Sequence, residues 1–306
     1  MAETPHRSGF VTIVGPPNVG KSTLVNAIVG EKIAITTPKP QTTRDRIRGI
    51  WTRPEAQIVF IDTPGVHKAR NRLNRAMVQA AVSTLSDVDL VYLMFDGTRL
   101  AEAPEKAQKT HDTLLDALAT VQRPAIALIN KVDKLRAKGA LLPIIEAVTA
   151  LGRFEAIVPV SALRAEGLDA LQAATLPLIP HGPPLFPGDA LTDRSLRFMA
   201  REIVREHLFM SLEQELPYQI AVSIDSWKER SEKLIAIHGS IHVARKSQKG
   251  IVIGKGGSRL KKVGARARRD LEALLETKVY LDLHVRVEEG WIDRAAGLRK
   301  LGYDDV

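Results

Sequence analysis

The 306-residue chain has no cysteine, which excludes disulfide bonds, thiolate catalysis and cysteine-ligated zinc. No apolar run approaches the roughly 20 residues that a membrane span needs. The polar start, Met1 to Gly9, lacks the apolar core of a secretory signal. We therefore expect a soluble, cytoplasmic protein with no transmembrane segment and at most peripheral membrane contact.

The chain has few acidic residues relative to basic ones: 35 Asp and Glu and 44 Lys and Arg give a net charge of +9. A basic chain favours a polyanionic partner. The length exceeds that of one typical domain, so we expect two domains, each long enough to bury a core.

The stretch from Gly15 to Ser22 fits the phosphate-loop pattern G-x-x-x-x-G-K-[ST] between a strand-like and a helical run. Its glycines let backbone N–H groups converge on a phosphate chain. Lys21 is placed to neutralise the β- and γ-phosphates, and Ser22 to bind Mg²⁺. The sequence predicts a nucleoside triphosphate site made by Gly15, Pro16, Pro17, Asn18, Val19, Gly20, Lys21, Ser22 and Thr23.

Two segments after this loop predict the rest of a Mg²⁺ and γ-phosphate site. Residues 31–45 are polar and punctuated by proline, which indicates an exposed loop in which a threonine, Thr42 or Thr43, completes the Mg²⁺ shell. A strand then ends in Asp62-Thr63-Pro64-Gly65. Its carboxylate can hold Mg²⁺ through water, and the N–H of Gly65 can reach the γ-phosphate.

The run Asn130-Lys131-Val132-Asp133, at the end of another apolar strand, selects the base. Asp133 can accept two hydrogen bonds from guanine, whereas adenine offers no such pair of donors. Lys131 can lie along the purine, and Asn130 can tie this loop to the phosphate loop. A later strand delivers Ser161-Ala162-Leu163, where a backbone N–H can meet guanine O6. The predicted ligands are GTP or GDP with Mg²⁺.

Strand-like runs alternate with helical periodicity over 70–85, 104–119, 139–151 and 167–178, which predicts an α/β domain with a mostly parallel sheet and helices on both faces. Residues 180–189 contain four prolines and two glycines and indicate a linker of limited flexibility. We expect a domain over 1–180, a linker over 181–192 and a second domain over 193–306.

The second half follows a different order: a helix over 195–212, strands over 217–224 and 233–243, a glycine-rich loop, a helix, and an alternating strand over 278–288. This order predicts an α+β domain. The helix that follows the glycine-rich loop has apolar residues at core spacing: Leu260, Val263, Leu271, Leu274 and Leu275.

The loop Gly254-Lys255-Gly256-Gly257 matches the G-x-x-G signature of KH domains, which lets a nucleic acid backbone approach closely. No acidic residue occurs between Glu232 and Asp270, where many Lys and Arg do. Such a one-sign field favours phosphate binding over an ordinary solvated face. The RNA-binding candidates are Gly254, Lys255, Gly256, Gly257, Lys249, Arg259, Lys261 and Lys262.

The first-half motifs occur in the order of a translation-factor-class GTPase. Followed by a type II KH domain, they resemble the Era family over essentially the whole chain. The resemblance favours Thr43 over Thr42 as the Mg²⁺ ligand, beside Ser22 and Asp62. It implies a GTP-hydrolysing switch whose KH domain binds the 3′ end of small-subunit ribosomal RNA and assists small ribosomal subunit assembly.

One residue departs from the Ras-like pattern. Val66 stands where Ras-like proteins orient the attacking water with glutamine, so we expect slow hydrolysis. Lys21, Thr43 and Gly65 remain catalytic-site candidates, and the water-positioning group stays open. The alternatives are an RNA-modification-associated GTPase, a membrane-associated cell-cycle signalling GTPase that meets anionic lipids at the inner face of the cell membrane, and an ATP-driven remodeller.

Overall fold

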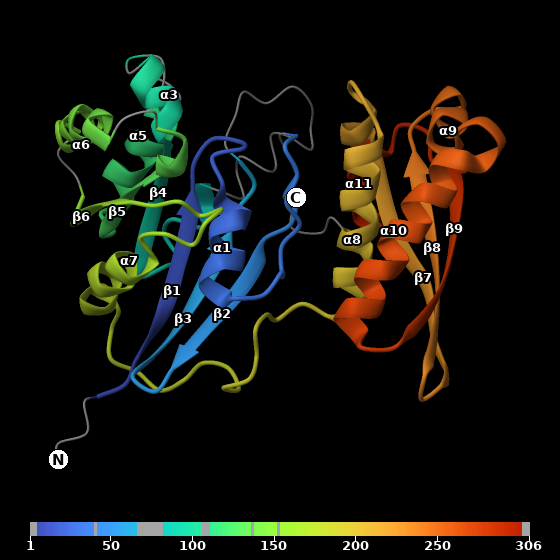
Figure 1. Cartoon of the computed structure of the whole chain (residues 1–306), viewed down its shortest axis with the longest axis horizontal. Coiled ribbons are helices and arrows are strands. Elements are labelled where there is room, and N and C mark those ends of the chain that lie inside the picture. Colours follow the sequence, from blue (N-terminus) through green and yellow to red (C-terminus); the bar gives the residue numbers. More distant parts are fainter. Residues whose placement is uncertain are drawn as a thin grey trace. The chain divides into compact units, whose positions relative to one another are not determined.

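The computed structural model describes residues 5–39, 42–65, 82–103, 105, 111–135, 138–151 and 154–301. They divide into two compact units (Figure 1). The described residues of 1–34, 43–69 and 76–193 form the first unit. The second contains Arg194 onwards together with the short segment from Ile35 to Thr42.

The first unit is built on a six-stranded sheet with the order β2-β3-β1-β4-β5-β6. All neighbours are parallel except β2 and β3. The strands are β1 (Arg7–Val14), β2 (Ile47–Arg53), β3 (Ala56–Asp62), β4 (Leu90–Asp96), β5 (Ala125–Asn130) and β6 (Ala156–Pro159). Every residue of β3, β4 and β5 is buried, as a sheet covered on both faces requires.

Helices cover both faces of this sheet (Figure 1). They are α1 (Lys21–Val29), α3 (Gly97–Glu102), α5 (Asp112–Val121), α6 (Leu141–Thr149) and α7 (Leu168–Thr175). On one face α5 and α6 pack against Val91, Leu93 and Phe95 of β4. The predicted α/β class is confirmed. The helix expected over 104–119 is described only from Asp112, and most of the one expected over 70–85 lies outside the described residues.

One of the contacts that hold the expected linker segment on the first unit is made by a buried side chain, Gln57. The Nε2 of Gln57 donates to the carbonyl of Phe186 at 2.9 Å. Its Oε1 accepts from the backbone N–H groups of Leu185 and Phe186 at 2.6 and 2.8 Å. These three bonds hold Leu185 and Phe186 in place.

The second unit is a three-stranded sheet with the order β7-β8-β9, in which β7 and β8 are antiparallel and β8 and β9 parallel. Its elements are α8 (Leu196–Ser211), β7 (Ile220–Ser231), β8 (Leu234–Val243), α9 (Lys246–Ile253), α10 (Ser258–Leu275), β9 (Lys278–Val287) and α11 (Ala295–Lys300). The predicted α+β order of a type II KH domain is thereby confirmed.

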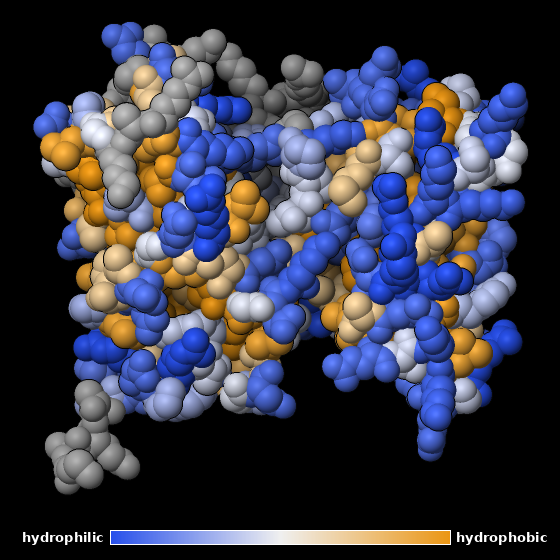
Figure 2. Space-filling view, in the orientation of Figure 1, coloured by the Kyte–Doolittle hydropathy of each residue, from blue (hydrophilic) through white to orange (hydrophobic). Residues whose placement is uncertain are grey.

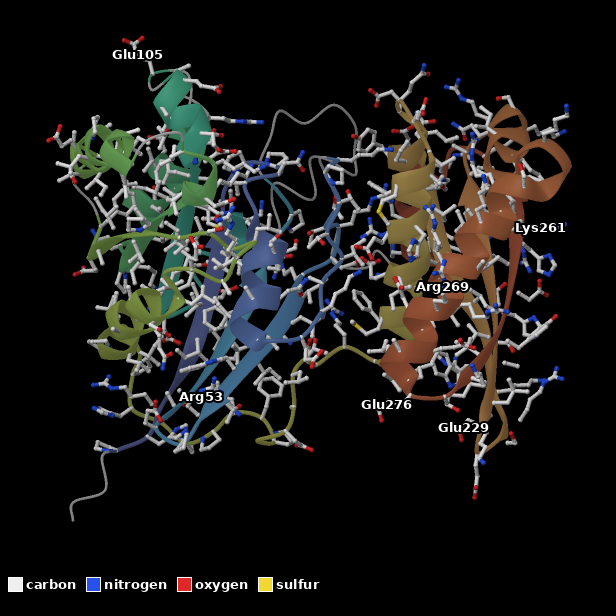
Figure 3. The ribbon with its side chains drawn as sticks, in the orientation of Figure 1. Arg53, Glu105, Glu229, Lys261, Arg269 and Glu276 are labelled. Atoms are coloured by element: carbon white, nitrogen blue, oxygen red, sulfur yellow. The ribbon has the colours of Figure 1, made fainter. Side chains whose placement is uncertain are left out.

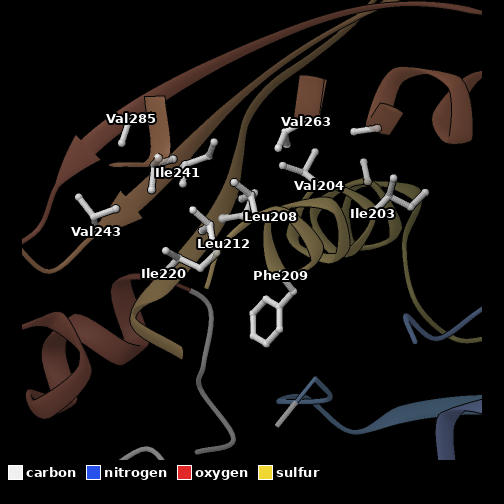
Figure 4. Packing of buried hydrophobic residues seen from close by; sticks show 14 of the residues in the cluster. Ile203, Val204, Leu208, Phe209, Leu212, Ile220, Ile241, Val243, Val263 and Val285 are labelled. Atoms are coloured by element: carbon white, nitrogen blue, oxygen red, sulfur yellow. The ribbon is translucent and has the colours of Figure 1, made fainter. Parts of the chain in front are cut away.

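The core of this unit lies between α8, α10 and the sheet. Figure 4 shows Val204 and Leu208 of α8 in the same cluster as Val263 of α10 and Ile241 of β8. The buried side chains of α10 recur every four residues. Val263, Ala267 and Leu271 are buried, and Leu275 packs against the same cluster. The expectation for Leu274 is wrong, because it falls beside this row and is 37% exposed.

Candidate functional site

The phosphate-loop residues join the carboxyl end of β1 to the first turn of α1, which begins at Lys21. The Lys21 ammonium is buried and donates to the carbonyl oxygens of Gly15 and Pro16, each at 3.1 Å. Burial lowers the pKa of Lys21 to about 8, although the nearby Asp62 carboxylate acts in the opposite direction. A poorly hydrated cation under a curled backbone can neutralise a phosphate chain.

Gly20 shows why the loop needs glycine. Its φ is +111°, and a Cβ atom there would lie 2.2 Å from Nδ2 of Asn130. That amide nitrogen donates to the carbonyl of Val19 at 2.7 Å. The predicted tie between Asn130 and the phosphate loop is therefore present.

Three oxygen-bearing side chains meet beside the loop. The Oγ of Ser22 donates to Oδ2 of Asp62 at 2.6 Å and lies 2.8 Å from Oγ1 of Thr43. The Thr43 hydroxyl also donates to the same carboxylate oxygen at 3.3 Å. Thr42 is turned elsewhere, because its hydroxyl donates to the carbonyl of Lys39 at 2.8 Å. The structure therefore brings Thr43, and not Thr42, to Ser22 and Asp62.

The Asp62 carboxylate has unused capacity. Burial raises its pKa, against the opposing effects of Lys21 and of hydrogen bonds from Ser22 and Thr43. Its second oxygen, Oδ1, is buried and has no hydrogen-bond partner among the described residues. A buried carboxylate beside two hydroxyls is an oxygen-rich donor set of the kind that Mg²⁺ prefers. The residues present fit that ion.

The described residues of the segment 31–45 are more buried than its composition predicts, although Glu31, Lys32 and Pro38 are exposed. Ile33 and Ala34 are buried, because Asn26 on α1 accepts hydrogen bonds from both of their N–H groups, at 3.1 and 2.9 Å. Asn26 also donates to the carbonyl of Ala34 at 2.8 Å. Thr43 is buried as well. The start and the end of the described segment are thus fixed on the first unit.

The expected base-reading residues come together at the ends of β5 and β6. The Oδ1 of Asn130 accepts the N–H of Ala162 at 2.9 Å, and Asp133 accepts the Ser161 hydroxyl at 2.7 Å. Lys131 has a left-handed backbone, with φ +68°, and donates to the carbonyl of Asn18 at 2.7 Å. One network of hydrogen bonds therefore joins this loop to the phosphate loop.

Sequence reasoning assigned no role to Asp96, the last residue of β4. Its Oδ2 lies 2.6 Å from the Lys131 ammonium, and its Oδ1 accepts from the Thr98 N–H at 3.1 Å. Burial disfavours its ionisation, yet hydrogen bonds from Lys131 and Thr98 hold the pKa of Asp96 below its ordinary value. The available signal was a carboxylate at the end of a buried strand, on the same sheet edge as Asp62 and Asn130.

The remaining predicted nucleotide residues differ in how far the structure fixes them. The Thr63 hydroxyl donates to the carbonyl of Ile13 at 2.7 Å, which fixes the strand end, and Gly65 lies directly against Pro17. Leu163 is 74% exposed. Val66 lies outside the described residues.

The glycine-rich loop joins α9 to α10. Gly254 has φ +75°, and a Cβ atom there would lie 2.8 Å from Cβ of Arg259. Most of the basic residues predicted for RNA binding are exposed around it: Lys249, Lys255, Lys261 and Lys262, with Arg259 partly buried. An open glycine loop bordered by exposed lysines can receive a nucleic acid backbone.

The long helix α10 carries positive charge along its surface. Figure 3 shows Lys261 and Arg269 on this helix, while the acidic Glu276 lies at its end and Glu229 on the β7–β8 hairpin. Figure 2 shows hydrophilic side chains crowded over the same helix. Glu276 thus lies at the opposite end of α10 from the glycine-rich loop.

Comparison with known proteins agrees with both sites. Residues 10–131 match the family described as 50S ribosome-binding GTPase, and residues 215–292 match the KH domain. The chain is 48% identical to GTPase Era of Geotalea uraniireducens over 99% of this chain and 100% of the relative. It is 50% identical to GTPase Era of Geobacter metallireducens over the same shares.

Two solved structures share the fold with a TM-score of 0.91 and 39% identity, over 97% of this chain and 99% of theirs. One is an Aquifex aeolicus Era variant bound to GDP and AlF4⁻. The other is Era in complex with MgGDPNP and nucleotides 1506–1542 of 16S ribosomal RNA. The GTPase and KH family matches, with full-length similarity to these proteins, show that this chain belongs to the GTPase Era family and is a GTP-hydrolysing enzyme.

Proposed function

We propose that this protein is a GTP-dependent switch that binds the 3′ end of 16S ribosomal RNA through its KH domain and assists small ribosomal subunit assembly. The observation that carries the proposal is the open Gly254 to Gly257 loop and its exposed lysines, joined in one chain to a guanine-specific phosphate site. A solved relative binds that RNA region together with a GTP analogue.

In the nucleotide site, we propose that Lys21 and the loop backbone bind the phosphates and that Asp133 accepts the guanine N1–H and N2 hydrogens. Asn130 acts by positioning, because it joins the two loops that contact the nucleotide. Ser22, Thr43 and Asp62 would hold Mg²⁺, which supplies positive charge for the phosphate oxygens when bound. Their convergence on one carboxylate supports this assignment.

Hydrolysis needs a group that orients water, and the side chain of Val66 cannot form a hydrogen bond to it. We therefore propose a slow basal rate, with the N–H of Gly65 contacting the γ-phosphate. The strand end that carries Gly65 is fixed by the bond from Thr63 to Ile13, which favours a preformed contact.

In the second half, we propose that the RNA backbone crosses Gly254, Lys255, Gly256 and Gly257, with Lys249, Arg259, Lys261 and Lys262 against its phosphates. We also propose domain limits of 1–180 and 193–306, with a linker over 181–192. Among the described residues, no helix is long and apolar enough to cross a membrane. We propose a cytoplasmic place, because the proposed partner is ribosomal RNA, which a solved relative binds.

The test is filter binding of an RNA with the sequence of the 16S 3′ end to the full-length protein with a GTP analogue. The paired substitutions Gly254→Asp and Gly257→Asp place two negative charges in the loop and should abolish RNA binding. GTP affinity, measured in parallel, should stay within about twofold, because the loop belongs to the other unit. Undiminished RNA affinity in this variant would refute the proposal.

A further inference from the structure

The proposed function leaves one charged group of the nucleotide site without a role. Asp96 ends β4 and lies opposite Asn130 in the register of β4 and β5, at the sheet edge that also carries Asp62. Its side chain is only 6% exposed. A buried carboxylate costs free energy unless charges and hydrogen bonds compensate it, so the partners of Asp96 indicate what it does.

The partner of one carboxylate oxygen is Lys131. Oδ2 of Asp96 accepts from the Lys131 ammonium at 2.6 Å, and the same ammonium donates to the carbonyl of Asn18 in the phosphate loop at 2.7 Å. Two acceptors thus hold the end of the Lys131 side chain. They restrain the methylene stem that lies along the purine in the proposed site.

The partner of the other oxygen is the helix that follows β4. Oδ1 of Asp96 accepts from the Thr98 hydroxyl at 2.6 Å, from the Thr98 N–H at 3.1 Å and from the Arg99 N–H at 3.4 Å. Asp96 therefore caps the first turn of α3. These bonds fix the orientation of the carboxylate and aim Oδ2 at Lys131.

Lys131 needs such restraint, because its backbone is in the left-handed region, with φ +68°. This conformation costs free energy in a residue other than glycine and persists where the surroundings fix it. It turns the chain from β5 into the short helical turn Val132–Lys134, which contains Asp133. The residue after β4 also lies close to this loop, because a Cβ atom on Gly97 would be 3.0 Å from the carbonyl oxygen of Asn130.

We propose that Asp96 is a positioning residue for guanine recognition. Acting through the Lys131 ammonium, its carboxylate holds the loop from Asn130 to Asp133 in the conformation in which Asp133 meets the base, and it thereby slows release of the nucleotide. The inference rests on the proposed nucleotide assignments. It adds to them a residue that acts on the nucleotide only through Lys131.

The experiment is a double-mutant cycle in the full-length protein, measured as the rate at which a fluorescent GDP analogue is released into excess GDP. Asp96→Asn keeps the size of the side chain and the oxygen that caps α3, but it removes the negative charge beside Lys131. Release should be about tenfold faster, the loss expected when a charged hydrogen bond becomes a neutral one. In a Lys131→Met background, which has no ammonium to hold, Asp96→Asn should change the rate by less than about twofold.

A purely structural role would give a different result, because a weakened helix cap would speed release equally in both backgrounds. Equal acceleration with and without Lys131, or wild-type release from Asp96→Asn, would overturn the inference. A wild-type protein with no preference for GDP over ADP would instead refute the proposed guanine site.

Arg99→Gln is the matched control. The Nε of Arg99 lies 3.8 Å from the same carboxylate oxygen, but this side chain is exposed and belongs to α3. Release from this variant should stay within about twofold of the wild type. A tenfold acceleration in Arg99→Gln would count against an action through Lys131.

A second variant covers the case in which Asp96→Asn fails to fold. Thr98→Ala removes the hydroxyl that donates to Oδ1 of Asp96, on a half-buried side chain, and keeps the carboxylate charge. The less firmly oriented carboxylate should give about threefold faster release in the wild-type background and no change in Lys131→Met. Unchanged release in the wild-type background, or faster release in both, would contradict the role assigned to Asp96.

Discussion

Asn130 offers a direct way to measure how the nucleotide site is held together. It is 2% exposed, and its amide joins Val19 of the phosphate loop to Ala162 of the base loop through bonds of 2.7 and 2.9 Å. The change Asn130→Ala removes both bonds and leaves a buried carbonyl and a buried N–H unpaired. At about 1 kcal/mol for each lost bond, the two loops lose about 2 kcal/mol of mutual support.

Nucleotide binding needs both loops in place, so the loss of about 2 kcal/mol should lower the affinity for the nucleotide by the same free energy. About 2 kcal/mol corresponds to a roughly 30-fold rise in Kd. The assay is titration of the full-length protein with a fluorescent GDP analogue. The assay uses a GDP analogue and not a GTP analogue, because GDP binding does not depend on contacts to the γ-phosphate.

Asn26→Ala is the matched control. Asn26 also forms three hydrogen bonds to a loop, but these hold Ile33 and Ala34 and not the base loop. At the same value for each bond it should lower the free energy of unfolding by about 3 kcal/mol, and it should leave GDP affinity within about threefold. Equal GDP affinity in wild type and Asn130→Ala would refute the reasoning.

Three further predictions concern the same site. Asp133→Asn should shift preference from guanine to xanthine nucleotides, which competition with XTP checks; full GTP selectivity in the variant would contradict the base assignment. Thr43→Val should reduce the Mg²⁺ dependence of GTP-analogue binding by about tenfold, whereas Thr42→Val should leave it unchanged. A reduction in Thr42→Val and none in Thr43→Val would show that the wrong threonine was assigned. The lowered pKa of Lys21, about 8, means that above it the unfolded chain binds more protons than the folded one. The free energy of unfolding should therefore rise between pH 8 and 10, by about 2 kcal/mol more in the wild type than in Lys21→Met. Urea unfolding of the nucleotide-free proteins measures this difference, and an equal rise in both would contradict the lowered pKa of Lys21.

Much of the first unit could be predicted because its signals are local. The phosphate loop has fixed spacing between a strand and a helix, and fully apolar runs such as β4 indicate a strand covered on both faces. The alternation of apolar and polar residues in β9 likewise predicted which side chains are buried. Val279 and Val285 are buried, whereas Tyr280 is 52% exposed. Patterns of this kind depend only on neighbours in the sequence.

Other features depend on contacts between residues that are far apart in the sequence, and local sequence patterns do not predict such contacts. The choice between Thr42 and Thr43 follows from which hydroxyl reaches Ser22, 21 positions away for Thr43. Asp96 acquires its role from Lys131, 35 positions later. The burial of Ile33 follows from the Asn26 side chain, although the surrounding residues are polar and rich in proline.

The partly exposed Leu274 shows a limit of periodicity itself. Leu271, Leu274 and Leu275 all fit a helical core pattern, but only one row in steps of four faces the sheet. Where α10 ends, the core covers Leu275 and leaves Leu274 beside it. The sequence alone does not say which of two adjacent leucines the core reaches.

The central claim is that the nucleotide site and the glycine-rich loop work as one switch. The most direct measurement is the rate of GTP hydrolysis with and without an RNA of the 16S 3′ end, in wild type and in the Gly254→Asp, Gly257→Asp variant. We predict a slow basal rate in both proteins and stimulation by the RNA in the wild type alone. No stimulation of the wild type, or equal stimulation of the variant, would contradict the account.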